Sequence, residues 1–520
     1  MNANADALRE ALDKGLRATL DEVIPWFHAQ MPAAYFADTS ERERVAHIMA
    51  VATARMAGQP PRLTLRSEDG ARWTFISDLD KPGMLGDILV QLPPDAALRL
   101  VKVHTSADGR LSVDTVVLGE APRFDEADPV LAARREAALA YAREQGADVT
   151  AVDRFLRGAA AEFVRAATPL RVVRATALFA EVSGSDDTVV SLEAERDPTL
   201  SRVVVVLGNA SPRRVAERCA AALGAGGINI LRAYVDVAAD GANGTVTSLT
   251  YVVHGPDGGA VDPQSDLWRR VSAELTRMKW VTDAALALSR RDPELGLTRA
   301  EVVIALASIA HQCLVRENPY AFSRARVLEL ATQGLALSGD IAALLMKRFD
   351  PEAPLLGASF MSRAEALRGR IHHGADGDDA RKVLSTMLVA VERALRCNVH
   401  FPRRYGLALR LDPALVSRPD LPEVPFGLYF VHGLGFDAFH LRFRDIARGG
   451  VRVVRPSGAV QLAAERDRLY DEVYGLAHAQ QLKNKDIPEG GAKAVIVAAP
   501  EHAAIDPTRN PSMVPAARAT

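Results

Sequence analysis

Two separated stretches of this 520-residue chain follow the same succession of elements, and this repetition constrains the fold most strongly. Each shows a strand with alternating apolar residues, a loop that enters a helix, a strand, a turn and a further strand. The first covers residues 62–118 and ends in a hairpin around Asp108-Gly109. The second begins at Ser201, and its helix starts at Ser211-Pro212. Such blocks predict a multidomain α/β and α+β protein.

The shared order of elements resembles the ACT-like fold, a small βαββ-type module known for regulatory amino-acid binding. In the first block, Asp80-Lys81-Pro82-Gly83-Met84-Leu85 is similar to the loop-to-helix signature of that fold. A glycine lets a ligand approach the backbone, and a helix N-terminus offers free N–H groups to a carboxylate. The resemblance therefore implies an amino-acid effector. The alternative is an ordinary helix start in a module that only holds subunits together.

The remaining sequence alternates between helical and strand periodicity. Helical spacing covers residues 4–57, 125–182 and 297–397, and strands such as YGLALRLD and FGLYFVHG follow. We therefore predict six segments, which are a helical segment at 1–60, an ACT-like module at 61–120, a helical linker at 121–200, a second ACT-like module at 201–290, a helical region at 291–400, and an α/β domain at 401–520.

Composition excludes several classes of partner. The formal net charge is −2 and the sequence pI is about 6.7, so there is no electrostatic reason to expect nucleic acid or an anionic membrane as partner. The three cysteines lie far apart without a CxxC spacing, which favours a reducing compartment over a disulfide framework or a zinc site. The N-terminus alternates acids and bases along an amphipathic helix, and this predicts a cytoplasmic protein without a membrane span.

Several common catalytic motifs are missing from the sequence. It contains no GxSxG, no GxxxxGK[ST] and no GxGxxG, so we predict no Rossmann domain in this chain. His311, His372, His373 and His400 lack the helical spacing, with a glutamate between, that a zinc protease uses. No metal site is predicted.

Two stretches combine cations with glycine pairs. In FHLRFRDIARGGVRVVRP, Arg448 precedes Gly449-Gly450, and in QQLKNKDIPEGGAKAVIV, Lys493 follows Gly490-Gly491. A glycine pair lets a carboxylate reach backbone and cation together, because no Cβ stands in the way. Any one of these cations alone is more simply read as a solvated surface charge. Their conjunction favours an anion site.

A helical segment is predicted over residues 459–482, between the two cationic stretches. Val460, Leu469, Val473 and Leu476 would share its apolar face. Lys483 would then lie at the helix C-terminus, where the helix dipole favours a cation.

The two stretches resemble the signature of NAD-specific glutamate dehydrogenases, in the large-subunit form with a long N-terminal extension. VHFPRRYGLALRLDP and PFGLYFVHGLGFDAFH are similar to the same family, so the resemblance covers residues 390–497. It implies that residues 401–520 begin a glutamate dehydrogenase substrate-binding domain. It also implies oxidative deamination of L-glutamate to 2-oxoglutarate and ammonia, NAD as cofactor, and a homo-oligomer.

The resemblance also implies roles for individual residues. Lys493 matches the catalytic lysine, Lys483 the lysine that holds the α-carboxylate, and Arg448 the position that reaches the side-chain carboxylate. The glycine pairs at 449–450 and 490–491 complete the substrate-binding set, and Lys485 is a solvated loop charge. The sequence departs from the family pattern in two places: Ala494-Val495 replaces a glycine pair, and the interval between Lys483 and Lys493 is shorter.

In the family, the catalytic aspartate and the NAD-binding domain follow the lysine motif, whereas this chain ends at Thr520. The expectation is therefore an incomplete fragment of such an enzyme, with no cofactor-binding residues of its own. The alternative is a catalytically dead regulatory protein that senses amino acids through its ACT-like modules.

Overall fold

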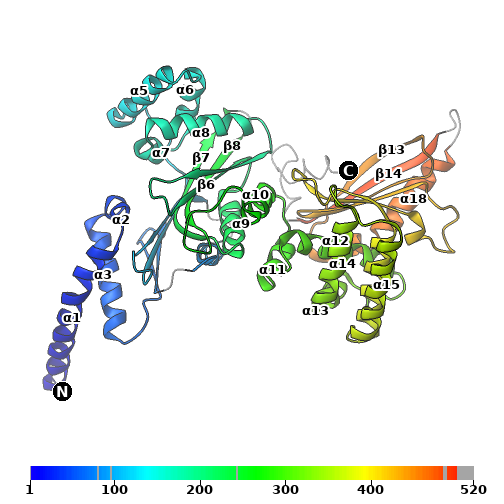
Figure 1. Ribbon diagram of the computed structural model, residues 1–520, viewed down its shortest axis with the longest axis horizontal. Helices are drawn as coiled ribbons and strands as arrows, with labels where there is room; N and C mark the ends of the chain where they lie inside the picture. Colours follow the sequence, from blue (N-terminus) through cyan, green and yellow to red (C-terminus); the bar gives the residue numbers. More distant parts are fainter. Residues whose placement is uncertain (1, 79–80, 94–96, 242–243, 484–488, 501–520) are drawn as a thin grey trace. The chain divides into compact units, whose positions relative to one another are not determined.

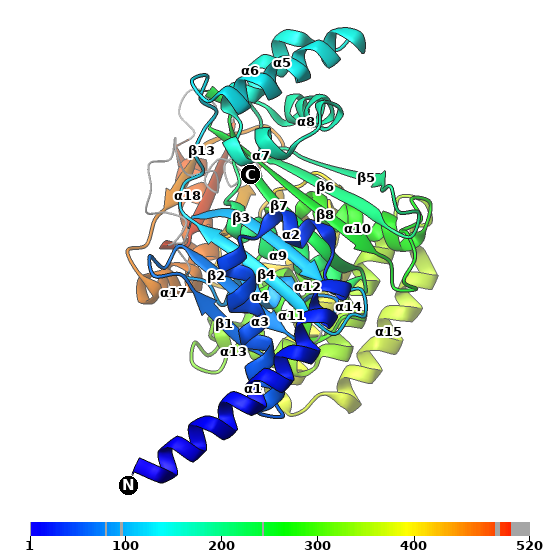
Figure 2. The same ribbon diagram turned by 90° about the vertical axis from the view of Figure 1, so that its left-hand side faces the viewer.

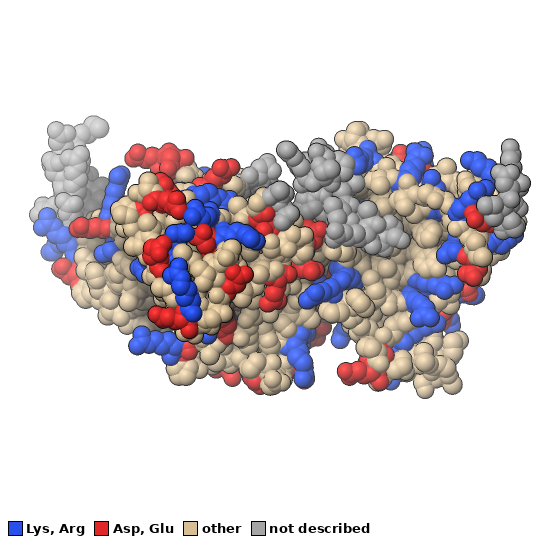
Figure 3. All heavy atoms as spheres, turned by 90° about the horizontal axis from the view of Figure 1, so that it is seen from above, with Lys and Arg blue, Asp and Glu red and all other residues tan. Residues whose placement is uncertain are grey.

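The computed structural model describes residues 2–78, 81–93, 97–241, 244–483 and 489–500, with side chains from residue 14 onward (Figure 1). The chain divides into two compact units, Met1–Lys279 and Trp280–Thr520. Both contain helices and sheets, which confirms a multidomain α/β architecture. On the face drawn in Figure 3, acidic side chains lie among basic ones, in keeping with the formal net charge of −2.

Three helices begin the first unit, as the helical spacing predicts. They are α1 (Asn2–Gln30), α2 (Ala33–Asp38) and α3 (Glu41–Met56). The last of them starts at a capping box, in which Ser40 and Glu43 bind each other's backbone N–H groups. Their apolar side chains, including Phe27 and Val51, form one core with Ile76 and Val113 of the first sheet, and Figure 2 shows these helices in front of that sheet.

A buried histidine in α3 gives this core a predicted pH dependence. His47 is 3% exposed, and its Nδ1 lies 2.7 Å from the Tyr35 hydroxyl. Burial lowers the pKa of His47 from 6.5 to about 4, so the folded protein keeps this side chain neutral. As the pH falls from 7 to 5, only the unfolded chain gains this proton, and the folded state should lose about 2 kcal/mol of stability.

We expect His47→Gln to remove this part of the pH dependence, as measured by urea unfolding at pH 7 and pH 5. An equal loss of stability in the wild type and the variant would contradict the assignment.

The first unit contains two modules of the same topology. The first consists of β1 (Leu63–Arg66), β2 (Arg72–Ser77), α4 (Met84–Val90), β3 (Leu98–Thr105) and β4 (Ser112–Leu118). The second consists of β5 (Thr188–Ala194), β6 (Ser201–Gly208), α9 (Pro212–Ala225), β7 (Asn229–Ala239) and β8 (Thr245–His254), and α10 (Asp266–Arg277) follows. Their antiparallel sheets have the orders β1-β2-β4-β3 and β5-β6-β8-β7.

The predicted succession of a strand, a helix and two further strands is present in both modules. The predicted start of the second block at Ser201 is wrong, because β5 precedes it and pairs with β6 along its length. This strand is a sheet edge of mixed composition, TVVSLEA, so its sequence carries little periodicity.

The two modules lie side by side, with β3 next to β7 and α4 next to α9. Glycines allow the helices to approach closely. A Cβ on Gly224 would lie 2.4 Å from the Gly83 Cα, and one on Gly86 would lie 3.3 Å from the Ala221 nitrogen. Gly83 itself has φ of 91°, a left-handed conformation that favours glycine immediately before α4. The chain therefore pairs its two modules internally.

A helical layer separates the two modules in sequence and covers one face of the second sheet. Apolar side chains of these helices, including Phe155 and Phe179, pack against Val204 and Val206 of β6. The helices α9 and α10 belong to the other face, where Tyr251 of β8 donates a hydrogen bond to the Ala216 carbonyl. The layer comprises α5 (Pro129–Glu144), α6 (Val149–Gly158), α7 (Ala161–Ala166) and α8 (Pro169–Val182).

The second unit begins with helices and continues into one mixed sheet. The helices are α11 (Asp283–Arg291), α12 (Leu297–Leu314), α13 (Arg324–Gln333), α14 (Leu335–Arg348), α15 (Gly357–Gly374) and α16 (Asp378–Glu392). The helix α12 is long and apolar enough to cross a membrane, but 78% of it is buried inside the unit, as in a core helix. The predicted helix through residue 397 ends earlier, because residues 394–397 pair with the next strand.

The sheet of the second unit has the order β13-β14-β12-β11-β10-β9, and within the described strands only β13 and β14 pair in parallel. Two helices connect this parallel pair and place α18 against β14 and β12. The strands are β9 (Ala394–Cys397), β10 (Gly406–Leu411), β11 (Gly427–Gly433), β12 (Phe436–Arg442), β13 (Ala447–Val454) and β14 (Gly490–Ala498), and the helices are α17 (Ala459–Asp467) and α18 (Leu469–Leu482).

Candidate active site

The two cationic stretches form neighbouring strands. In the parallel pair of β13 and β14, Arg448 lies opposite Gly491, and Gly450 lies opposite Lys493. Because side chains two residues apart share a face of a sheet, Arg448 and Lys493 project from the same face, about 7 Å apart along the strand direction. The sequence stretches are thus brought together, as the anion-site hypothesis requires.

The helix α18 lies on this same face. The Gly491 N–H donates a hydrogen bond of 2.7 Å to the Gln481 side-chain oxygen. Arg452, on the same face of β13 as Arg448, lies 3.0 Å from the Glu472 carboxylate of α18. The helix therefore forms one wall beside the two cations.

Close packing explains three of the four glycines but not the fourth. A Cβ on Gly449 would lie 1.6 Å from the Ala492 carbonyl oxygen, one on Gly490 would lie 2.5 Å from the Arg444 Cβ, and one on Gly491 would lie 2.1 Å from the Ala477 carbonyl oxygen. These three are explained by close packing. At Gly450, the nearest atom to an added Cβ is the Lys493 ammonium nitrogen at 3.8 Å. Of the four, only Gly450 would accept a Cβ without a clash, and that Cβ would be in ordinary contact with a cation.

The cations themselves are weakly paired. Lys493 is half-buried in β14, and no described carboxylate forms an ion pair with it. Arg448 has Glu489 at 3.6 Å, a long distance for an ion pair. Positive charge on this face is therefore available to an added anion.

Lys483 is the C-cap residue of α18, as predicted, and its side chain is exposed. Lys485 lies outside the described residues, so its predicted role as a solvated charge stays a prediction. Sequence reasoning did not single out Gln481 and Glu489, although both belong to the same short stretch. Their closeness in sequence to Gly490-Gly491 could have indicated that they belong to the site.

The predicted helical segment over 459–482 is present, but it consists of two helices, α17 and α18, with a break at Arg468. Val460 is consequently 88% exposed and does not join the apolar face. Leu469 and Val473 do face the sheet, and Tyr470 packs edge-on against Phe439 of β12 at 5.7 Å. The apolar face that holds α18 in place thus begins only at Leu469.

A buried carboxylate fixes the helix that precedes α18. Asp437 of β12 lies 2.6 Å from His432, 2.9 Å from Arg466 of α17 and 3.4 Å from Arg324 of α13. Burial alone would raise the pKa of Asp437, but Arg324, Arg466 and His432 outweigh it and hold that pKa well below its usual range. This charged cluster ties the two helices to the sheet.

The four histidines considered for metal binding lie apart. His311 binds Asp467 at 2.9 Å, His400 lies 2.9 Å from the Met346 carbonyl, and His372 and His373 are exposed at the end of α15. Over the described residues, no group of three His, Cys, Asp or Glu side chains is arranged to hold a metal ion.

Comparison with known proteins identifies the class to which this site belongs. Residues 370–513 match the family described as "Bacterial NAD-glutamate dehydrogenase, catalytic domain". This part of the chain is similar to that family, and the resemblance to NAD-specific glutamate dehydrogenases is confirmed.

Individual relatives are also named glutamate dehydrogenases. The NAD-specific glutamate dehydrogenase of Saccharomyces cerevisiae is 44% identical over 119 residues, which are 23% of this chain and 11% of the yeast protein. Glutamate dehydrogenase 2 of Dictyostelium discoideum is 39% identical over 121 residues, 23% of this chain and 12% of that protein. The NAD-specific enzyme of Mycobacterium tuberculosis is 28% identical over 214 residues, 39% of this chain and 12% of that protein. The matched region is thus a small part of each relative.

Proposed function

We propose that β13, β14 and α18 hold the dicarboxylate of L-glutamate for NAD-dependent oxidative deamination to 2-oxoglutarate and ammonia. The observation that carries this proposal is the placement of Arg448 and Lys493 on one face of adjacent parallel strands, with no close backbone neighbour above Gly450 between them. The family match over residues 370–513 supplies the reaction.

Each cation has a separate proposed task. Arg448 binds the side-chain carboxylate, because a guanidinium can donate two parallel hydrogen bonds to it. Lys483 binds the α-carboxylate, so that the two ends of the substrate are fixed and the Cα–H bond takes one orientation. Once the Cα hydrogen has left as hydride, Lys493, beside Gly450, takes a proton from the water that attacks the resulting iminium carbon and returns a proton to the departing ammonia.

NAD would supply the acceptor for the hydride. The sequence has no GxGxxG, and none of its described residues is assigned to that cofactor. The proposed contribution of this chain is therefore substrate binding and proton transfer.

The role of Arg448 can be tested by ligand selectivity. We expect Arg448→Gln to weaken binding of 2-oxoglutarate at least ~10-fold, because one charge-assisted contact is lost. Binding of 2-oxobutyrate, which lacks the distal carboxylate, should stay unchanged. Calorimetric titration of the 520-residue chain measures both.

The matched control for this test is Arg396→Gln, an exposed arginine at the opposite edge of the same sheet. Equal weakening of both ligands by Arg448→Gln, or an equal effect of the control variant, would contradict the assigned role.

For the first unit, we propose that the two paired modules are ACT-like and bind an amino-acid effector. Their common topology and the close approach of α4 and α9 support this proposal. Part of the suggested ligand loop, at residues 79–80, lies outside the described residues. We further propose a cytoplasmic homo-oligomer, and the six-segment division of the chain stays a prediction.

A further inference from the structure

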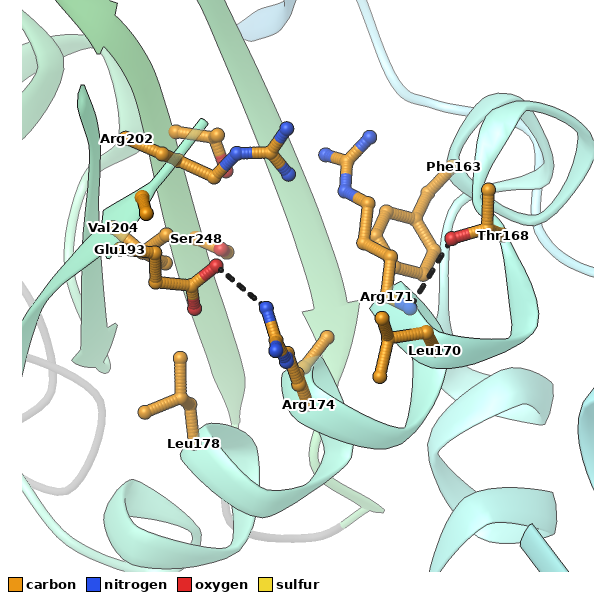
Figure 4. Close-up of a pocket in the computed structure, with 13 residues that line it drawn as sticks. Phe163, Thr168, Leu170, Arg171, Arg174, Leu178, Glu193, Arg202, Val204 and Ser248 are labelled. Atoms are coloured by element: carbon orange, nitrogen blue, oxygen red, sulfur yellow. Dashed lines mark hydrogen bonds and ion pairs between the residues drawn. The ribbon is translucent and has the colours of Figure 1, made fainter. Parts of the chain in front are cut away.

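The first unit contains a cavity of about 210 Å³ between α8 and the second sheet (Figure 4). Its wall has a polar part and an apolar part. Arg171 and Arg174 of α8 and Arg202 of β6 line it together with hydroxyl groups, while Leu178, Val204 and other apolar side chains form the rest. The volume lies below the ~300–1,000 Å³ typical of sites for drug-sized ligands, so a small molecule would fill it.

Two of the arginines face each other. In Figure 4, the guanidinium groups of Arg171 and Arg202 point toward one another, from the helix and from the sheet, respectively. Like charges placed face to face repel, and an anion between them would relieve that repulsion. The arrangement therefore favours occupation by a negative group.

The carboxylates near these arginines leave donors available. Arg171 approaches Asp236 at 3.4 Å, and Arg174 approaches Glu193 at 3.4 Å, each through a single nitrogen. A guanidinium has five N–H donors, so neither contact saturates it. Arg202 is more firmly held, because two of its nitrogens donate to Glu195.

Each of the three arginines contacts one carboxylate, but only Glu193 among these carboxylates lines the cavity itself. Burial raises the pKa of Asp236 to about 6 despite the presence of Arg171, so this counter-ion is lost in mildly acidic solution.

We propose that this cavity binds a small carboxylic acid with a compact apolar body. The carboxylate lies between the guanidinium groups of Arg171 and Arg202, where charge-assisted and bidentate hydrogen bonds are strongest. The body packs against the apolar part of the wall, including Val204 and Leu178. Such a ligand would connect the helical layer to the second sheet.

This cavity is separate from both sites discussed above. Val204 and Thr250 project from the sheet face that α8 covers, whereas their neighbours Val203 and Tyr251 project toward α9. The loops that lead into α4 and α9 are therefore not part of it. The glutamate site belongs to the other unit of the chain.

The test uses the 520-residue chain and 4-methylpentanoate as probe, with saturable binding followed by ligand-observed NMR. We expect the neutral amide, 4-methylpentanamide, to bind at least ~10-fold more weakly, because it lacks the charge. Arg171→Gln and Arg202→Gln should each weaken the acid at least ~10-fold. Should Arg202→Gln unfold the protein, Arg174→Gln, at the most exposed of the three positions, keeps the test open: it removes a positive charge from the same wall and should weaken the acid, though less than Arg171→Gln does.

Two controls separate this cavity from other anion sites. Arg154→Gln, at an exposed position on α6 outside the cavity, should leave binding unchanged. Saturating 2-oxoglutarate should also leave it unchanged, so a failure here is distinguishable from a failure of the proposed glutamate site.

Several outcomes would overturn the proposal. They are the absence of saturable binding, equal binding of acid and amide, binding that Arg171→Gln and Arg174→Gln do not alter, and displacement by 2-oxoglutarate. Tighter binding of inorganic phosphate than of 4-methylpentanoate would overturn the requirement for an apolar body.

Discussion

In an enzyme that joins this sequence to an NAD-binding domain, replacing Lys493 by glutamine is expected to lower the rate of glutamate-dependent NADH formation by ~10²–10⁴-fold, the range typical of a lost general acid or base. We expect this loss because of the position of Lys493. Lys493 lies beside Gly450, on the same face as Arg448, and we propose that its amine serves the reacting carbon. Glutamine is polar and one bond shorter than lysine, and it can neither take nor return a proton. The absorbance of NADH follows the reaction.

The control for this prediction is Lys347→Gln, at an exposed lysine of the same unit whose partner is Asp350. It should leave the rate unchanged. Thermal unfolding of both variants should match that of the wild type. A Lys493→Gln protein that forms NADH as fast as Lys347→Gln would contradict the assignment of Lys493.

The second large effect is expected on stability. Alanine at position 491 would place its Cβ 2.1 Å from the Ala477 carbonyl oxygen and 2.2 Å from the Gln481 nitrogen, both in the backbone of α18. Backbone cannot rotate away as a side chain can, so α18 must separate from β14. We expect Gly491→Ala to cost about 3 kcal/mol or more.

Gly450→Ala is the matched control, since the nearest atom to its Cβ is the Lys493 ammonium nitrogen at 3.8 Å. Hydrogen exchange of the β14 amides, read by mass spectrometry, should be accelerated in Gly491→Ala and close to wild type in Gly450→Ala. Equal protection of β14 in the two variants would contradict the packing of α18 on this strand.

Local periodicity in the sequence was sufficient to predict most helices and strands, including the repeated modules and the strands around Arg448 and Lys493. It did not predict the structure of segments that depend on contacts with residues distant in the sequence. Residues 394–397 continue a helical pattern, yet they form an edge strand because β10 offers a partner. The break at Arg468 is likewise invisible in the apolar spacing, since α17 is held by Arg466 and the buried Asp437.

The candidate site was predicted in part. The cations and glycines were identified from their sequence context and family resemblance, and the structure places two of the cations on one face. The sequence could not reveal that Gly449, Gly490 and Gly491 are required by packing, whereas Gly450 would accept a Cβ without a clash. The arginine cavity was also missed, because Arg171 and Arg202 are far apart in sequence and meet only in the fold.

The central claim is that this chain holds a site for the dicarboxylate of glutamate. Calorimetric titration of the 520-residue chain with 2-oxoglutarate tests it most directly. The account predicts one saturable site per chain, from which L-glutamate displaces 2-oxoglutarate. The absence of saturable binding, or a site from which L-glutamate does not displace the ligand, would contradict it.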